Sequence, residues 1–165
     1  MKDGFWQTES SGTGNLGITF GDNYDVKKRG SSSLEVIITE GKYGYVALRH
    51  TWEDPVDFSE GKYLVLFVYG HNSGRKFSIT FWTTSREDYF TYEVKDNFEG
   101  WRLLFVSLKD FKVGGTPLWS VIKGMLVKFW DGNWSSRKEL YLDQISVVKK
   151  PSLQQLYEAS VIILP

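Results

Sequence analysis

The stretch Lys76-Phe77-Ser78-Ile79-Thr80-Phe81-Trp82 alternates large apolar residues with smaller or polar ones. Successive side chains of a β-strand point to opposite faces of its sheet, so this alternation predicts a strand with one buried and one open face. The expected core row is Phe77, Ile79 and Phe81, and the outer row is Ser78, Thr80 and Trp82. The stretch therefore predicts part of a sheet that covers a core with one face.

Further segments have the same character, rich in Val, Ile, Phe, Tyr and Thr, with Gly-rich or Asn-rich breaks between them. A helical turn is expected near Pro117 to Ile122, but helical periodicity is otherwise almost missing. Many short strands with so little helix predict an all-β fold, a two-sheet antiparallel β-sandwich of the jelly-roll type. The expected strands are residues 4–9, 15–20, 33–39, 43–52, 62–69, 76–82, 88–95, 101–108, 122–130 and 139–148.

The length of 165 residues suits one domain with a two-layer core. We expect the domain at 1–150 and a C-terminal tail or linker at 151–165, in which residues 152–159 form a short helix. The first seven residues lack the apolar stretch of a signal peptide, which leaves a cytoplasmic protein or a piece of a secreted parent.

The 20 basic and 20 acidic residues cancel, so the chain lacks the charge expected of a nucleic-acid or membrane-surface binder. No apolar run reaches the length of a membrane span. The absence of cysteine excludes disulfides, thiolate catalysis and zinc–thiolate sites, and only His50 and His71 are available for a histidine-rich metal centre. The 7 Trp, 9 Tyr and 11 Phe exceed the needs of a core of this size, which predicts rings at the surface.

The same alternation sorts the side chains of the strands expected at 43–52, 88–95 and 122–130. The predicted outer face, with one loop residue, holds Trp82, Trp130, Arg49, Lys128, Tyr89, Glu93, Tyr45 and Trp134. Aromatic rings stack on the C–H patches of a pyranose, and charged groups hydrogen-bond its hydroxyls, so this set indicates a sugar-binding face. The alternative interpretation is structural: the indoles pack or cap the sandwich, and Arg49 and Lys128 pair with Glu93 across strands.

Three segments carry a family resemblance. Residues 57–70 run from Asp-Phe-Ser into a long apolar strand that ends at Gly70, and residues 98–111 contain Gly-Trp, an apolar strand and a final Phe. Residues 140–148 place Asp143 within an apolar strand, and residues 30–36 precede all three in the chain. In this order the segments resemble the jelly-roll carbohydrate-binding modules of bacterial glycoside hydrolases, a group that includes β-glucan-binding and mannan-binding modules.

The resemblance implies a non-catalytic module that binds a β-glucan, glucomannan or mannan-like chain in a groove. It also implies an attached catalytic domain, a secreted or cell-surface location, and a structural calcium ion. That ion would be held by Asp143, backbone carbonyls and an N-terminal acid, for which Glu9 is the expected residue and Glu35 the alternative. Otherwise Asp143 accepts hydrogen bonds from neighbouring backbone groups.

Two other functions remain open. The same aromatic face could bind a protein partner or a second copy of the chain. A jelly-roll glycosidase or lyase would need two positioned carboxylates, for which Glu93 and Asp131 are the nearest choice in the sequence. The sequence contains no Ser-His-Asp arrangement, nucleophile elbow, phosphate loop or compact acidic strand motif, so we expect no enzymatic activity.

Overall fold

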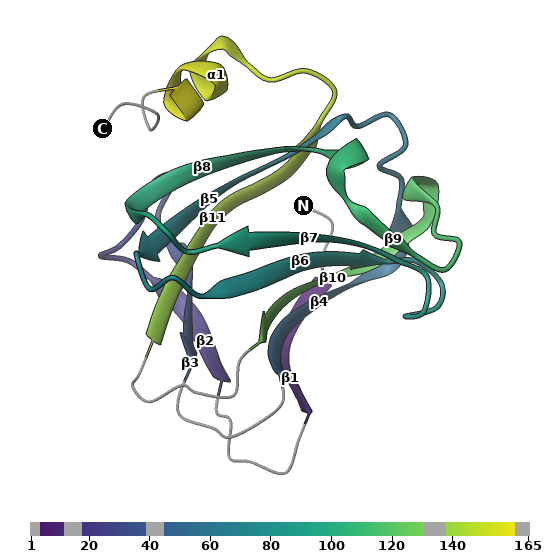
Figure 1. Cartoon of the computed structure of the whole chain (residues 1–165), viewed down its shortest axis with the longest axis horizontal. Helices are drawn as coiled ribbons and strands as arrows, with labels where there is room; N and C mark the ends of the chain where they lie inside the picture. The colour runs from purple at the N-terminus through teal and green to yellow at the C-terminus, as the bar shows by residue number, and fades with distance from the viewer. Residues whose placement is uncertain (1–3, 12–17, 39–44, 131–137, 161–165) are drawn as a thin grey trace.

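The computed structural model describes residues 4–11, 18–38, 45–130 and 138–160, which form two antiparallel sheets packed face to face (Figure 1). The six-stranded sheet has the order β1 (Gly4–Ser11), β4 (Tyr45–Val56), β10 (Ile122–Trp130), β6 (Lys76–Trp82), β7 (Tyr89–Lys95), β9 (Lys112–Gly114). The five-stranded sheet has the order β2 (Ile18–Asn23), β3 (Ser33–Ile38), β11 (Lys138–Val148), β5 (Tyr63–His71), β8 (Glu99–Ser107). This arrangement confirms the predicted jelly-roll sandwich.

The ten expected strands correspond to observed strands, although residues 15–17, 39 and 43–44 lie outside the described residues. Strand β9 was not expected, because three residues are too short for an alternating pattern to show. The helical turn expected near residues 117–122 is a 3₁₀ turn at Trp119–Val121, and another 3₁₀ turn covers Leu108–Asp110. The short C-terminal helix is α1 (Leu153–Ser160).

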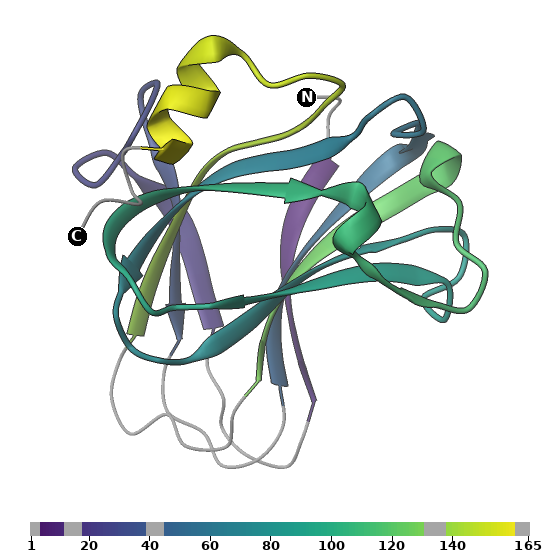
Figure 2. The ribbon, with the colours of Figure 1, turned by 45° about the horizontal axis from the view of Figure 1, so that its top comes forward.

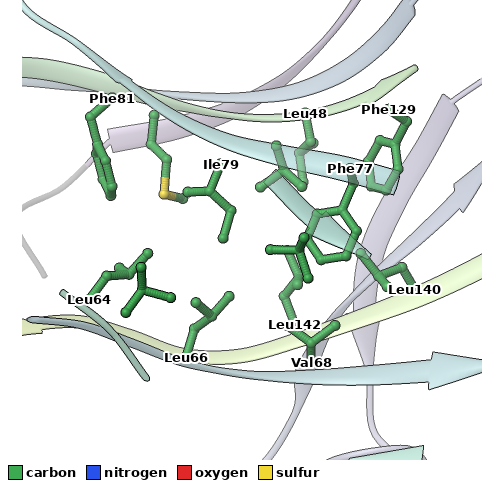
Figure 3. Packing of buried hydrophobic residues seen from close by; sticks show 14 of the residues in the cluster. Leu48, Leu64, Leu66, Val68, Phe77, Ile79, Phe81, Phe129, Leu140 and Leu142 are labelled. Carbon is green, nitrogen blue, oxygen red and sulfur yellow. The ribbon is translucent and has the colours of Figure 1, made fainter. Parts of the chain in front are cut away.

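Apolar side chains from the two sheets meet in one central core (Figure 3). Phe77, Ile79 and Phe81 of β6 all point into it, as their alternation predicts. Leu64 and Leu66 of β5 face them from the other sheet. Burial of each such side chain contributes about 1.5–3 kcal/mol. Because the core fixes the inward row of every strand, it also fixes which residues reach the outer face.

The two outer faces differ in character. On the five-stranded sheet, Val65, Phe67 and Leu103 form a separate buried cluster on the side away from the core. Lys28 and Arg29, from the β2–β3 connection, lie over the ring of Phe67. The helix α1 contacts β8 of the same sheet (Figure 2). Within residues 4–11, 18–38, 45–130 and 138–160, no helix is long and apolar enough to cross a bilayer. The outer face of the six-stranded sheet is the one that carries polar rows.

Candidate functional site

A groove of about 610 Å³ runs over the outer face of the six-stranded sheet. Strands β6, β7, β9 and β10 and the β6–β7 loop line it, and it contains four residues of the predicted ligand-binding set: Trp82, Tyr89, Glu93 and Lys128. The other lining residues are Lys76, Ser78, Thr80, Arg86, Thr91, Lys112 and Leu126. Alternation along the strands thus brings together side chains that are up to 52 positions apart in the chain, as Lys76 and Lys128 are.

An aromatic strip, formed by Trp82 and Tyr89, crosses one end of the groove. The two residues are register partners on β6 and β7, so their side chains emerge side by side. A Cβ at Gly124 would overlap the indole of Trp82, and a Cβ at Gly114 would overlap the ring of Tyr89. Each ring therefore extends over a glycine of the strand next to its own, and the two glycines make room for the strip.

Trp82 is much less open than the sequence analysis expected. It lies on the outer face, but only 6% of its surface is exposed. Its indole is held between the backbone at Gly124 and the guanidinium of Arg86, whose Cζ lies 5.4 Å from the ring centroid. The expectation of a freely presented indole is corrected here, because the β6–β7 loop supplies a cation that covers the ring. Tyr89, which is half-buried, is the more accessible ring of the strip.

Lys128 lines the groove from β10. Its Nζ lies 3.7 Å from the ring centroid of Tyr45, a cation–π contact. Partial burial lowers the pKa of Lys128 from its ordinary value of 10.5, while the negative charge of Glu9 opposes that shift. The Tyr45 hydroxyl donates a hydrogen bond of 3.0 Å to Glu9. Tyr45 thus supports the lysine from the same face without lining the groove itself.

The other polar groups of the groove come from β6 and β7. Lys76 Nζ lies 2.7 Å from Glu93 Oε1, and this hydrogen bond lowers the pKa of the Glu93 carboxyl. The hydroxyls of Thr80 and Thr91 hydrogen-bond across the strands at 2.8 Å. Along the strands that lead away from the aromatic strip, the groove therefore offers hydroxyls, a carboxylate and an ammonium, which suits a ligand with many hydroxyl groups.

The remaining predicted residues lie elsewhere. Arg49 Nη2 donates to Gln7, and Nη1 lies 3.5 Å from Glu9, so it faces β1 and does not pair with Glu93. Trp130 pairs in register with Tyr45, but its side chain, like all of Trp134, lies outside the described residues.

Three groove residues were not expected from the sequence: Lys76, Arg86 and Lys112. Arg86 stands in a hairpin loop directly after Trp82, and that proximity was the available signal. Lys112 was missed together with its strand, β9. Lys76 lies in the outer row that alternation itself defines, so the same reasoning could have included it.

The structure does not bring Asp143 and Glu9 together. Glu9 is on β1 of the six-stranded sheet and is engaged by Arg86 and Tyr45, whereas Asp143 is on β11 of the other sheet. Asp143 Oδ2 accepts the backbone N–H groups of Lys28 at 3.0 Å and Arg29 at 2.8 Å, which is its alternative role. The predicted pair therefore does not fit a shared calcium ion.

Glu35, the other expected ligand, accepts a hydrogen bond of 3.3 Å from Asn23 and lies opposite Tyr141 in register. Within the described ranges, no three His, Asp or Glu residues gather in a way that could hold a metal ion. The acids proposed as calcium ligands thus have polar partners from the protein itself.

No protein-family model matches the chain, and no curated protein matches its sequence. Solved structures do match. A family 11 carbohydrate-binding module from Clostridium thermocellum, solved with a β-1,3-1,4-mixed-linked tetrasaccharide, has a TM-score of 0.68 at 13% identity, covering 87% of this chain and 88% of that one. The family 30 module of a cellulosomal cellulase from the same organism has a TM-score of 0.70 at 16% identity, covering 92% and 95%.

An exo-β-agarase matches with a TM-score of 0.62 at 12% identity, over 88% of this chain and 24% of the agarase. The matched part of that enzyme is therefore a minor fraction of it. At identities this low, the likeness bears on architecture. The chain has the β-sandwich fold of the family 11 and family 30 carbohydrate-binding modules, and the expected resemblance is confirmed at the level of the fold.

Proposed function

We propose that the protein is a non-catalytic module that binds a polysaccharide chain in the groove of the six-stranded sheet. The observation that carries this proposal is one open groove that holds the aromatic strip of Trp82 and Tyr89 at one end and Lys128 and Glu93 farther along the strands. The family 11 module, which shares the fold, was solved with a β-1,3-1,4-linked tetrasaccharide. A β-glucan, glucomannan or mannan-like chain is the ligand class that we infer.

Two kinds of contact contribute to the free energy of sugar binding in this groove. A sugar ring on the exposed part of the strip gains about 1–3 kcal/mol from buried apolar area at roughly 25 cal/mol per Å². Hydrogen bonds from the hydroxyls of neighbouring sugar units to Lys128 and Glu93 add to this gain. Two or three such subsites correspond to an affinity that is roughly micromolar, which suits a module that must release and rebind along a polymer.

The charges in the groove favour binding without bond cleavage. Glu93 is the one carboxylate among the described groove-lining residues. A glycosidase needs two carboxyls, one of which holds its proton near neutral pH because its pKa is raised. The hydrogen bond from Lys76 lowers the pKa of Glu93, so this carboxyl is ionised and poorly suited to donate a proton. In our proposal the chemistry belongs to a separate catalytic domain.

A moderate affinity for the polysaccharide is useful to a module that is linked to a catalytic domain. Binding to the polymer would hold a linked glycoside hydrolase near its substrate and raise the effective concentration of the two partners. We propose that the chain acts as part of such a secreted or cell-surface enzyme.

Affinity gel electrophoresis tests the proposal. The protein is run through gels that contain barley β-glucan, glucomannan or galactomannan, and through gels without polysaccharide. We expect retardation in at least one polysaccharide gel. Tyr89→Ala and Lys128→Ala should each weaken binding about 5- to 100-fold, the equivalent of about 1–3 kcal/mol. Retardation by none of the three polymers, or equal retardation of wild type and both variants, would reject the groove.

Tyr24→Ala is the matched control, because Tyr24 is 62% exposed and belongs to the β2–β3 connection, away from the groove. Its mobility should equal that of the wild type in every gel. A stable dimer that loses its association in Tyr89→Ala would instead assign the aromatic face to a protein contact. Reducing ends released on long incubation, and lost in Glu93→Gln, would overturn the non-catalytic assignment.

A further inference from the structure

A second cavity, of about 430 Å³, lies between the two sheets, on the core side of the six-stranded sheet. Its walls come from both layers: Trp6, His50 and Trp52 on one side, and Leu34, Leu142 and Val147 on the other. Asp22 and Gln144, which are exposed, belong to the lining as well, so the cavity reaches the surface at this edge. By comparison, a cavity of about 150 Å³ is enough to hold benzene.

His50 is the unusual residue of this pocket. It is only 5% exposed, and its ring lies between Trp6, at a centroid distance of 4.8 Å, and Trp52, at 5.0 Å. Neither ring nitrogen has a hydrogen-bond partner among the residues described. Buried polar side chains nearly always have partners, because an unsatisfied donor or acceptor keeps its full cost of desolvation. An imidazole in this position is suited to a hydrogen-bonding guest.

The pocket lining indicates which guest would fit. Trp52, Phe58 and Phe81 form a chain of edge-to-face contacts, with centroid distances of 5.9 Å at both steps. The ring of a guest molecule could pack against these side chains in the same edge-to-face geometry. The described lining holds the carboxylates Asp22 and Asp143 and no Lys or Arg, so a carboxylate or phosphate guest would meet like charge without a counterion.

We propose that this pocket binds a small neutral aromatic molecule with one hydroxyl group, such as a simple phenol. The guest ring packs against Trp52 and Phe58, and its hydroxyl hydrogen-bonds to His50. Burial lowers the pKa of His50, so at neutral pH the imidazole is uncharged and has one donor and one acceptor nitrogen. This site is separate from the groove: the two share no lining residue, and the pocket lies on the inner side of the six-stranded sheet whereas the groove lies on its outer face.

The test uses 4-ethylphenol as the probe, with ethylbenzene and 4-ethylbenzoate for comparison. Binding is followed by the amide and indole N–H signals in two-dimensional ¹H–¹⁵N NMR spectra. We expect 4-ethylphenol to shift the indole signals of Trp6 and Trp52 saturably, ethylbenzene to bind at least fivefold more weakly, and 4-ethylbenzoate to have no effect at neutral pH. Absence of saturable shifts with 4-ethylphenol, or tighter binding of the benzoate, would overturn the proposal.

Two variants separate the hydroxyl contact from simple apolar filling. His50→Phe keeps a ring but removes both nitrogens, so it should abolish the preference for 4-ethylphenol over ethylbenzene. Ile145→Trp adds bulk at a half-buried lining position and should block both probes. Retention of the native NMR spectrum shows that each variant is folded, whether or not the groove binds polysaccharide. An unchanged preference in His50→Phe would overturn the assigned contact.

Discussion

Arg86 and Glu9 form an ion pair that spans the outer face of the six-stranded sheet, with Arg86 Nη1 2.9 Å from Oε1 and 2.8 Å from Oε2 of Glu9. Glu9 is on the edge strand β1, Arg86 follows β6, and strands β4 and β10 lie between β1 and β6. The curvature of the sheet brings these distant strands close enough to meet. On its way across, Arg86 covers the indole of Trp82.

Arg86→Ala should uncover Trp82. The side chain of Arg86 is 47% exposed, and ion pairs this open contribute only about 0–1 kcal/mol, so the protein should remain folded. We expect acrylamide to quench tryptophan fluorescence more strongly in Arg86→Ala than in the wild type. In a Trp82→Phe background the same substitution should add little quenching. An equal increase in both backgrounds would show that another indole is being exposed.

Gly124→Ala should displace the indole of Trp82 and so disturb the aromatic strip. The added methyl group would overlap the indole of Trp82 and approach the His50 carbonyl, so the ring must move. We expect a loss of stability of roughly 1–3 kcal/mol and weaker retardation in polysaccharide gels. Gly21→Ala is the matched control, since a Cβ at Gly21 meets nothing within 4 Å. If both variants bind polysaccharide like the wild type, the position of the Trp82 ring does not matter for binding.

The stability of the protein should depend on pH through His50. Burial lowers its folded-state pKa below the ordinary value of 6.5, so as pH falls through about 6.5 the unfolded chain takes up a proton before the folded chain does. Stability contributed by this group is therefore present above that pH and lost below it. Urea denaturation from pH 7.5 to 5 should show the free energy of unfolding of the wild type falling relative to that of His50→Phe as the pH is lowered. A difference between the two proteins that stays constant with pH would contradict this assignment.

Asp96 anchors the turn between β5 and β6. Its carboxylate is buried and accepts hydrogen bonds from the backbone N–H groups of His71 and Ser73, both at 3.1 Å, and from the Ser73 hydroxyl at 2.5 Å. Asp96→Ala leaves these donors without a partner and should lower the free energy of unfolding by about 2–4 kcal/mol. The exposed Asp110→Ala should change it by less than about 0.5 kcal/mol. Similar losses in both variants, measured by urea denaturation, would argue against the anchor.

All strands except β9, together with their inward rows, followed from the sequence alone. Alternation at 76–82 placed Phe77, Ile79 and Phe81 in the core, where the structure has them. This works because side-chain direction in a strand depends only on local geometry and has a period of two. The same local rule placed Trp82, Tyr89, Glu93 and Lys128 in the outer rows of their own strands.

Only the tertiary structure decided what those side chains meet. The cover of Arg86 over Trp82 depends on a loop and on sheet curvature, and the pairing of Glu93 with Lys76 depends on register. The separation of Glu9 from Asp143 depends on which sheet each strand joins. Strand order, register and curvature arise from contacts between residues far apart in the chain, whereas a sequence pattern records only the direction of each side chain within its own strand.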